Sequence, residues 1–156
     1  MTRELAPGDP APAFTLPRDG HGTATLKDFA GRKLVLFFYP KADTPGCTRE
    51  AIAFSQLKGA FNEADTDILG VSADSEKSQN AFKAKHALTV ALASDETRKM
   101  LTAYGVWREK SMYGRTFLGI VRTTFLIGRD GRIAQIWRNV KVGGHAEAVL
   151  TAARAL

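Results

Sequence analysis

Residues 33–50, "KLVLFFYPKADTPGCTRE", give the clearest indication of the architecture of this protein. Residues 33–39 are almost entirely aliphatic and aromatic, which is typical of a strand buried on both faces of a sheet. A turn containing proline and glycine follows. Thr44 is a favoured N-cap residue whose hydroxyl can accept a bond from a first-turn N–H, and Pro45 suits the first helical position. The sequence therefore predicts a buried strand that leads straight into a helix.

Cys47 is the only cysteine of the chain, and it falls near the third position of this predicted helix. A helix N-terminus carries roughly half a positive charge and unpaired N–H groups. Both favour the thiolate, which is the nucleophilic form of cysteine. The neighbouring residues are small or polar, so we expect a small molecule to reach the sulfur. A reactive cysteine is one interpretation; the other is a small buried hydrophobic residue, the usual environment of a free cysteine.

The rest of the chain alternates between strand and helix patterns. Residues 13–26 predict an N-terminal β-hairpin with its turn at residues 19–22. Apolar runs predict further strands at residues 67–71, 90–93, 122–127 and 133–137, the last two joined around Asp130 and Gly131. Helices are predicted through Ile52, Phe54, Leu57 and Phe61, and over residues 76–86, 96–104 (ending at Gly105) and 145–156. This order predicts one α/β domain over residues 1–156, with a mixed central sheet flanked by helices.

Length and composition are those of an ordinary globular protein. The 156 residues are 44% hydrophobic and 24% charged, so the chain can bury a core without a disulfide or a metal. No apolar run approaches the ~20 residues that cross a bilayer, and residues 1–14 contain no apolar signal-peptide region. A single cysteine excludes an internal disulfide and suits a reducing compartment. We therefore expect a cytoplasmic protein that does not associate with membranes.

The net charge of +6 is unevenly distributed, because residues 98–141 contain ten basic and two acidic residues. Such an excess is compatible with binding of nucleic acid or another polyanion. The basic residues are dispersed, however, and no nucleic-acid motif accompanies them. A solvated basic surface is the better interpretation, so we expect no nucleic-acid partner.

Other cysteine-based sites have little support in the pattern. A disulfide reductase needs a second cysteine three positions after the first, where this chain has Glu50. A zinc site would have to combine Cys47 with histidines whose spacing matches no common site: His21, His86 and His145. We therefore expect no metal, no other cofactor, and histidines that are ordinary surface residues. A Cys-His hydrolase stays open as an alternative, provided that one histidine lies beside the cysteine.

The motif around the cysteine resembles a family pattern. Pro40, Thr44, Cys47 and the supporting Thr48 match Pro-x-x-x-Thr-x-x-Cys-Thr, which is typical of the peroxiredoxins, and within them of the bacterioferritin-comigratory-protein (PrxQ) subfamily. The similarity continues through "GVSADSEKSQNAF", "EKSMYGRTFLGIVRTTFLIGRDGRI" and the C-terminal helix, so it covers almost the whole chain. It implies a thioredoxin-like fold, a mostly monomeric protein, and reduction of hydrogen peroxide and organic hydroperoxides in antioxidant defence.

The resemblance also implies a role for each matching residue. Cys47 is then the peroxidatic cysteine, whose thiolate attacks the peroxide and becomes a sulfenic acid. Thr44 binds the peroxide oxygen and the sulfur, and Pro40 shields the pocket from water. Arg122 holds the thiolate and polarises the peroxide. Glu50 matches an acidic position that orients an arginine in relatives.

The chain departs from the subfamily pattern in its lack of a resolving cysteine. The usual positions for that second cysteine are occupied by Ile52 and, in the next helix, by residues near Lys83. We therefore expect a one-cysteine peroxidase that is reduced by an external thiol: thioredoxin, glutathione with glutaredoxin, or another small thiol. A disulfide between the Cys47 residues of two chains is less favoured sterically. The alternative function is a non-enzymatic redox sensor or a polyanion-binding protein of the same fold.

Overall fold

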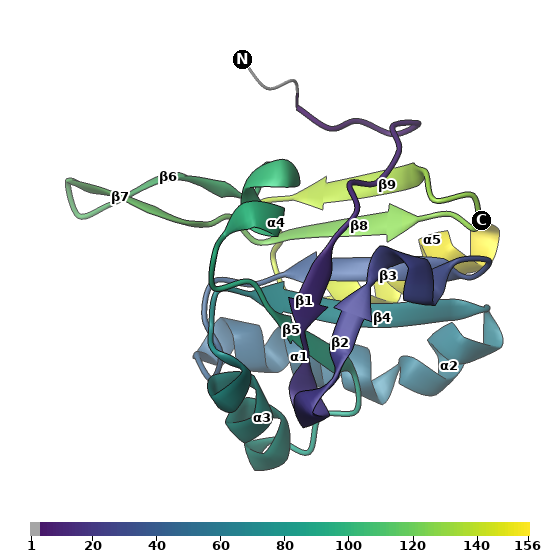
Figure 1. Cartoon of the computed structure of the whole chain (residues 1–156), viewed down its shortest axis with the longest axis horizontal. Coiled ribbons are helices and arrows are strands. Elements are labelled where there is room, and N and C mark those ends of the chain that lie inside the picture. Colours follow the sequence, from purple (N-terminus) through teal and green to yellow (C-terminus); the bar gives the residue numbers. More distant parts are fainter. Residues whose placement is uncertain (1–3) are drawn as a thin grey trace.

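The computed structural model describes residues 4–156, so the prediction that residues 1–14 hold no signal peptide falls partly outside the described residues. A five-stranded sheet forms the centre of the molecule in the order β5-β4-β3-β8-β9 (Figure 1). Its strands are β3 (Lys33–Phe38), β4 (Thr66–Ser72), β5 (Ala91–Ser94), β8 (Thr123–Ile127) and β9 (Ile133–Arg138). β3, β4 and β5 are parallel, whereas β8 runs antiparallel to β3 and β9 to β8. The predicted α/β architecture with a mixed sheet is confirmed.

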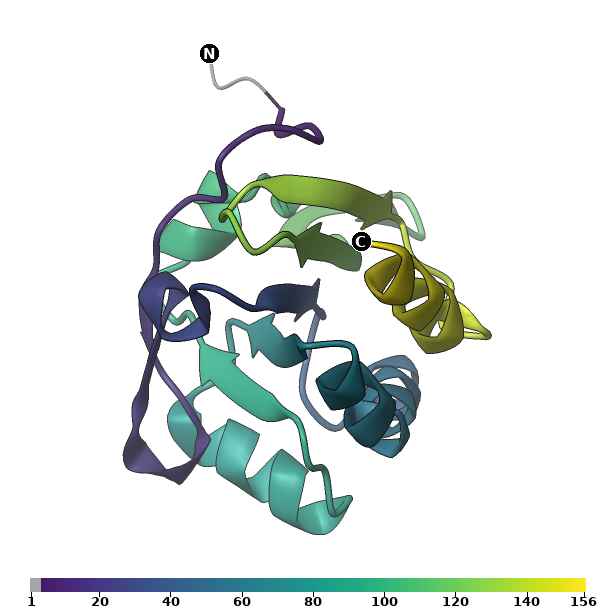
Figure 2. The ribbon, with the colours of Figure 1, turned by 90° about the vertical axis from the view of Figure 1, so that its right-hand side faces the viewer.

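Helices lie on both sides of this sheet (Figure 2). α1 (Pro45–Gln56), α2 (Lys58–Glu63) and α5 (His145–Ala155) pack on one face, and α3 (Glu76–Lys85) extends that core beside β5. The other face carries α4 (Lys99–Ala103) and the predicted N-terminal hairpin of β1 (Thr15–Pro17) and β2 (Thr23–Thr25), with short 3₁₀ turns at Asp19–His21 and Leu26–Phe29. The sheet therefore separates two hydrophobic cores.

β3 lies in the middle of the sheet and contributes to both cores. Its side chains alternate, so that Leu34, Leu36 and Phe38 pack on the side of the N-terminal hairpin. Val35 and Phe37 pack on the side of α1 and α2. All the residues of β3 are buried, which explains why the sequence shows a continuous apolar run rather than an alternation of polar and apolar residues.

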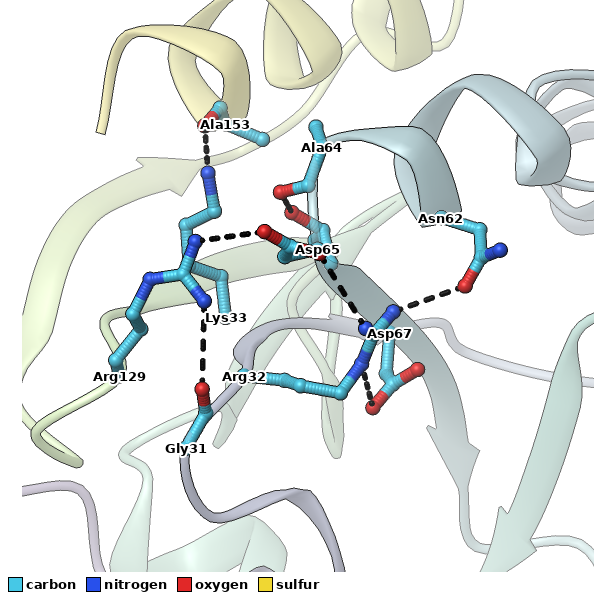
Figure 3. A network of polar contacts seen from close by, with 10 residues as sticks. Gly31, Arg32, Lys33, Asn62, Ala64, Asp65, Asp67, Arg129 and Ala153 are labelled. Atoms are coloured by element: carbon cyan, nitrogen blue, oxygen red, sulfur yellow. Dashed lines mark hydrogen bonds and ion pairs between the residues drawn. The ribbon is translucent and has the colours of Figure 1, made fainter.

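The first residue of β3 is a buried lysine. It lies at the amino end of the strand, opposite the end that leads into α1. Lys33 is 4% exposed, and its Nζ donates a 2.6 Å hydrogen bond to the carbonyl oxygen of Ala153 in the last turn of α5. Figure 3 shows this bond beside a network in which Asp65 pairs with both Arg32 and Arg129. The same carbonyl also accepts a 3.3 Å bond from the N–H of Leu156, so Lys33 is its second donor and joins α5 to the sheet.

Two predicted helices have different limits in the structure. The apolar pattern from Ile52 to Phe61 belongs to two helices, because the chain leaves helical geometry at Leu57 and the weak helix former Gly59 follows. The helix expected over residues 96–104 is shortened to α4, because the residue just before it has a left-handed backbone. Gly105, with a φ of 71°, follows α4 as predicted.

A hairpin that the sequence pattern does not predict projects from the body of the molecule (Figure 1). β6 (Trp107–Met112) and β7 (Arg115–Ile120) pair antiparallel around Tyr113 and Gly114, whose positive φ angles form the turn. Both strands are largely exposed, so they lack the alternation that marks a half-buried strand. No helix within residues 4–156 is long and apolar enough to cross a membrane.

Candidate active site

The topology brings distant segments together at the carboxyl end of β3. Residues 40–44 leave this end of the strand and lead into α1, which carries Cys47 in its first turn. β8 runs antiparallel to β3, so its first residue, Thr123, lies beside Phe38. Arg122 precedes Thr123 and therefore reaches the same edge, although it is 75 residues from Cys47 in sequence. Ligands of open α/β sheets commonly bind at this edge.

Cys47 occupies the third position of α1 and is 1% exposed. Its Sγ accepts a hydrogen bond of 3.4 Å from Nη2 of Arg122. The sulfur therefore lies at the N-terminal end of a helix and contacts a guanidinium donor. The predicted place in a helical first turn is confirmed. The predicted ready access is wrong for this conformation, because the side chain packs in the core between the sheet and α1.

Glu50 lies one helical turn after Cys47 and holds the guanidinium of Arg122 in place. Nη1 of Arg122 donates a 2.8 Å hydrogen bond to Oε1 of Glu50, which is 1% exposed. A glycine lies close to the same guanidinium, because a Cβ added to Gly46 would come within 3.1 Å of Nη2 of Arg122. The helix therefore provides the cysteine, the carboxylate and the space that the arginine needs.

The Glu50–Arg122 pair is buried, and this perturbs both groups. Burial raises the pKa of Glu50 to about 7, although the positive charge of Arg122 acts in the opposite direction. Burial acts to lower the pKa of Arg122, but the negative charges of Glu50 and Cys47 outweigh it and raise that pKa. Oε2 of Glu50 is buried without a hydrogen-bond partner among residues 4–156. Glu50 therefore exchanges its proton near neutral pH, next to the arginine that contacts the sulfur.

The other motif residues surround the start of α1. Thr44 is the N-cap residue, and its carbonyl oxygen accepts a 2.8 Å bond from the N–H of Thr48. The predicted cap bond from its side chain is absent; the hydroxyl donates instead to the carbonyl oxygen of Lys41, at 2.7 Å. Pro40 and Lys41 line a surface hollow of about 310 Å³ with residues of the β6–β7 hairpin, among them Trp107. The hydrogen bond from Thr44 to Lys41 therefore joins the two ends of the loop that leads to the cysteine.

One of the three histidines is not a surface residue, contrary to the sequence expectation. His145 is 7% exposed, and its Nε2 shares a 2.8 Å hydrogen bond with Oγ1 of Thr124. Its ring makes edge contacts with the rings of Phe54 and Trp137. Burial, helped by the charge of Arg122, lowers the pKa of His145 to about 4. The imidazole is therefore neutral at physiological pH.

The alternatives to redox chemistry gain no support from the histidines. His86 pairs with Asp43 and His21 with Glu76, while His145 bonds to a threonine. No histidine hydrogen-bonds to the cysteine within residues 4–156, so the structure provides no general base for a hydrolase. The same residues contain no cluster of side chains suited to a metal ion.

A buried polar chain next to the site is not predicted from the sequence. Gln79 is fully buried and connects Tyr39, Ser72 and the backbone of β5, and Ser72 in turn bonds to Asp74. One signal was available, because Gln79 lies one helical turn before the buried Phe82 and so falls on the buried face of α3. A polar residue on such a face needs partners in the core.

Comparisons with known proteins identify the family of the chain. A family model described as the AhpC/TSA family matches residues 7–136. Peroxiredoxin Bcp of Bacillus subtilis is 44% identical over 152 residues, which cover 97% of this chain and 96% of that protein. The structure of the bacterioferritin comigratory protein of Xanthomonas campestris matches with a TM-score of 0.87 at 46% identity, over 91% of this chain and 90% of that chain. A mutant PrxQ of Xylella fastidiosa gives a TM-score of 0.93 at 40% identity, over 99% and 98%.

These relatives share both the fold and the family of the chain. Structures of the X. campestris peroxiredoxin Q include two different cysteine-to-serine mutants. That relative therefore has at least two cysteines, whereas the present chain has one. Since the family model and the relatives cover most of the sequence, the chain belongs to the peroxiredoxins of the Bcp/PrxQ subfamily, which are thiol-dependent hydroperoxide reductases with a thioredoxin-like fold.

Proposed function

We propose that Cys47 is the peroxidatic residue of a one-cysteine cycle. Its thiolate attacks the nearer oxygen of a hydroperoxide, the O–O bond breaks, and the leaving oxygen takes up a proton to become water or an alcohol. The sulfur keeps one oxygen and becomes a sulfenic acid. No cofactor takes part in this step, because the two electrons come from the sulfur itself.

The contact between Arg122 and Cys47 is the observation that carries this proposal. During the reaction negative charge moves from the sulfur to the leaving oxygen, and fixed donors stabilise such a developing charge. Arg122 is fixed by Glu50 and directs its second nitrogen at the sulfur. A guanidinium has several donors in one plane, so it can contact the sulfur and a bound peroxide at the same time.

Thr44, Thr48 and Pro40 have supporting roles in this proposal. The hydroxyl of Thr44 binds the peroxide oxygen, which requires it to turn away from the carbonyl of Lys41. Thr48 ties the loop to α1 through its backbone bond to Thr44. Pro40 has no N–H to bind water, and it shields the end of the site that faces the hollow below the hairpin.

Recycling depends on a thiol from outside the chain. The positions of a resolving cysteine hold Ile52, inside α1, and Lys83, which pairs with Asp19. An external thiol attacks the sulfenic sulfur and releases water, and a second thiol then frees Cys47 by disulfide exchange. Because Cys47 is 1% exposed, the first turn of α1 opens during this step.

Turnover with defined reductants tests this cycle. We expect hydrogen peroxide and an organic hydroperoxide to be consumed continuously with thioredoxin, or with glutathione and glutaredoxin, and Cys47→Ser to abolish the activity while keeping the fold. A protein that reacts once and is recycled by none of these thiols would be a redox sensor instead. The measurement distinguishes the two, because a sensor consumes only one equivalent of peroxide.

The remaining parts of the proposal concern the oligomeric state, the cellular location and the binding partners. We propose a mostly monomeric protein in the reducing cytoplasm, where external thiols are abundant. Polyanion binding has less support, because Arg108 and Arg138 pair with Glu4, and Arg129 pairs with Asp65. A tight dimer in sedimentation at micromolar protein would contradict the monomer. Nucleic-acid binding that weakens steeply with salt would contradict the view of the basic segment as a solvated surface.

A further inference from the structure

We propose that Asp74 and Gln79 are positioning residues for the peroxide reaction, because they anchor a hydrogen-bond chain that runs from the buried Tyr39 to the half-buried backbone of the loop before Cys47. This inference rests on the proposed function. It assigns a task to polar residues that have no place in the motif around the cysteine. The task is to hold Pro40 and Thr44 in place relative to the sulfur.

The hydrogen-bond chain begins at Tyr39, the last residue before the loop of residues 40–44, and ends at Ala42 within this loop. The hydroxyl of Tyr39 bonds to Oε1 of Gln79. Nε2 of Gln79 donates to Oγ of Ser72 at 3.0 Å, and Ser72 donates to Oδ2 of Asp74 at 2.6 Å. The same carboxylate oxygen accepts a 2.8 Å bond from the backbone N–H of Ala42. One end of the chain thus packs with Cys47 in the core, and the other holds the loop.

The chemistry of the groups fixes the direction of every bond. Nε2 of Gln79 also donates to the carbonyl oxygen of Ala93 at 2.9 Å. Because a carbonyl oxygen only accepts, this bond excludes the flipped orientation of the Gln79 side-chain amide. Its Oε1 therefore accepts from Tyr39, and the hydroxyl of Ser72 is left to donate to Asp74. All the donors point toward one carboxylate, and bonds aligned in this way strengthen one another.

The loop depends on this anchor because few other bonds hold its backbone. Among the described residues, Ala42 supplies the only backbone N–H of residues 41–43 with a hydrogen bond, and that bond goes to Asp74. The next residue, Asp43, has a left-handed φ of 62°, which costs energy for a residue other than glycine. The side chain of Asp43 pairs with Lys85 and His86 on the exposed side of the loop. Without the Asp74 anchor, the exposed pairing of Asp43 with Lys85 and His86 would be the contact that still holds this part of the loop.

The position of the loop matters because the reaction requires alignment. Pro40 and Thr44 lie on either side of Ala42 in the sequence, so a shift of this backbone moves both. Displacements of about 1 Å at a reacting centre commonly cost on the order of a hundredfold in rate. Alkylation of the same sulfur by iodoacetamide needs the thiolate but not a peroxide-binding loop. The ratio of the rate of oxidation by hydrogen peroxide to the rate of alkylation by iodoacetamide therefore reports how well the loop is aligned with the sulfur. A general change in the exposure of the sulfur alters both rates and leaves their ratio unchanged.

The test measures both rates in the full chain. Asp74→Ala removes the anchor, and Gln79→Met removes the bonds of the amide at similar size. We expect each variant to be oxidised by hydrogen peroxide about tenfold more slowly, while alkylation by iodoacetamide changes less than twofold. Asp74→Asn keeps an oxygen that can accept from both Ala42 and Ser72, so it should restore most of the peroxide rate. Hydrogen exchange at the N–H of Ala42 should become faster in Asp74→Ala but not in Asp74→Asn.

A control separates positioning from stability. Lys33→Met removes the bond to Ala153 at the opposite end of β3; it should lower the stability to urea and leave the peroxide rate unchanged. The positioning role is wrong if Asp74→Ala and Gln79→Met lose stability but keep the peroxide rate, as this control does. It is also wrong if, in these two variants, the rates of peroxide oxidation and of iodoacetamide alkylation fall by the same factor. Slow oxidation of the parent protein would overturn the proposed function, and the positioning role with it. Fast oxidation of the parent with unchanged variants would overturn the positioning role alone.

Discussion

Nη2 of Arg122 lies 3.4 Å from Sγ of Cys47, while Nη1 of the same guanidinium is bound to the buried carboxylate of Glu50. The arginine lies just before β8, and the other two residues lie in α1. The antiparallel pairing of β8 with β3 brings them together. The geometry of the site is therefore a direct consequence of the mixed sheet.

The first prediction concerns Arg122→Ala. Because this change removes a fixed donor from the site of charge transfer, we expect the rate constant for oxidation by hydrogen peroxide to fall about a hundredfold. Arg122→Lys should recover only part of the rate, because an ammonium cannot bond to Glu50 and the sulfur in the fixed geometry of a guanidinium. Stopped-flow tryptophan fluorescence measures both. An unchanged rate constant in Arg122→Ala would remove the arginine from the mechanism.

The second prediction uses the close approach of Gly46 to Arg122. In Gly46→Ala the new Cβ would lie 3.1 Å from Nη2 unless the arginine moved. Alanine favours helix more than glycine does, so we expect stability to be kept while the peroxide rate falls several-fold. Gly59→Ala is the matched control, because a Cβ there meets nothing within 4 Å. It should add about 0.5–1 kcal/mol of stability and leave the rate unchanged; equal rates in both variants would refute the steric argument.

The third prediction follows from the raised pKa of Glu50. Between 4.5, its ordinary pKa, and about 7 in the folded protein, only the unfolded state has lost the proton. The contribution of Glu50 to the free energy of unfolding is therefore fully present below pH 4.5 and is lost as the pH rises through about 7. The difference between 4.5 and about 7 corresponds to roughly 3 kcal/mol. Glu50→Gln removes this contribution, so urea unfolding at several pH values should show the variant gaining stability relative to the parent over this range. A constant difference would contradict the buried acid.

The fourth prediction concerns His145 and has the opposite sign. Its pKa is lowered from 6.5 to about 4 in the folded protein, so in this range the unfolded state binds the proton more readily. The stability is fully present above pH 6.5 and is lost as the pH falls through about 4. His145→Gln can still bond to Thr124 but does not titrate. Its stability should fall less on acidification, by on the order of 1–2 kcal/mol after allowance for solvent screening. Parallel acid unfolding curves would exclude this role.

The local parts of the fold can be predicted from the sequence because local rules determine them. A continuous apolar run gives β3, and the order of Thr44 and Pro45 gives the start of α1. The break at Leu57 and the hairpin of β6 and β7 depend on tertiary packing and on exposure of both strands, which periodicity does not report. The burial of His145 had a local signal, since it precedes the buried Val149 by one helical turn in α5.

The site is predictable only in part. Cys47 follows from its helical position, and Glu50 shares its helix face, so both are local features. The place of Arg122 depends on the pairing of β8 with β3, which no short-range pattern reveals; only the family resemblance identified it. The hydrogen-bond chain from Tyr39 to Asp74 also depends on tertiary structure. Ser72, Asp74 and Gln79 are close in sequence, but Tyr39 reaches them only because β3 pairs with β4.

A single turnover of the fully reduced protein with one equivalent of hydrogen peroxide tests the role of Cys47. We expect oxidation much faster than that of an ordinary free thiol, with a mass gain of one oxygen located at Cys47. We also expect recovery of the reduced mass when thioredoxin, or glutathione with glutaredoxin, is added. Oxidation no faster than that of a free thiol, or modification at a residue other than Cys47, would show that Cys47 is not the peroxidatic residue.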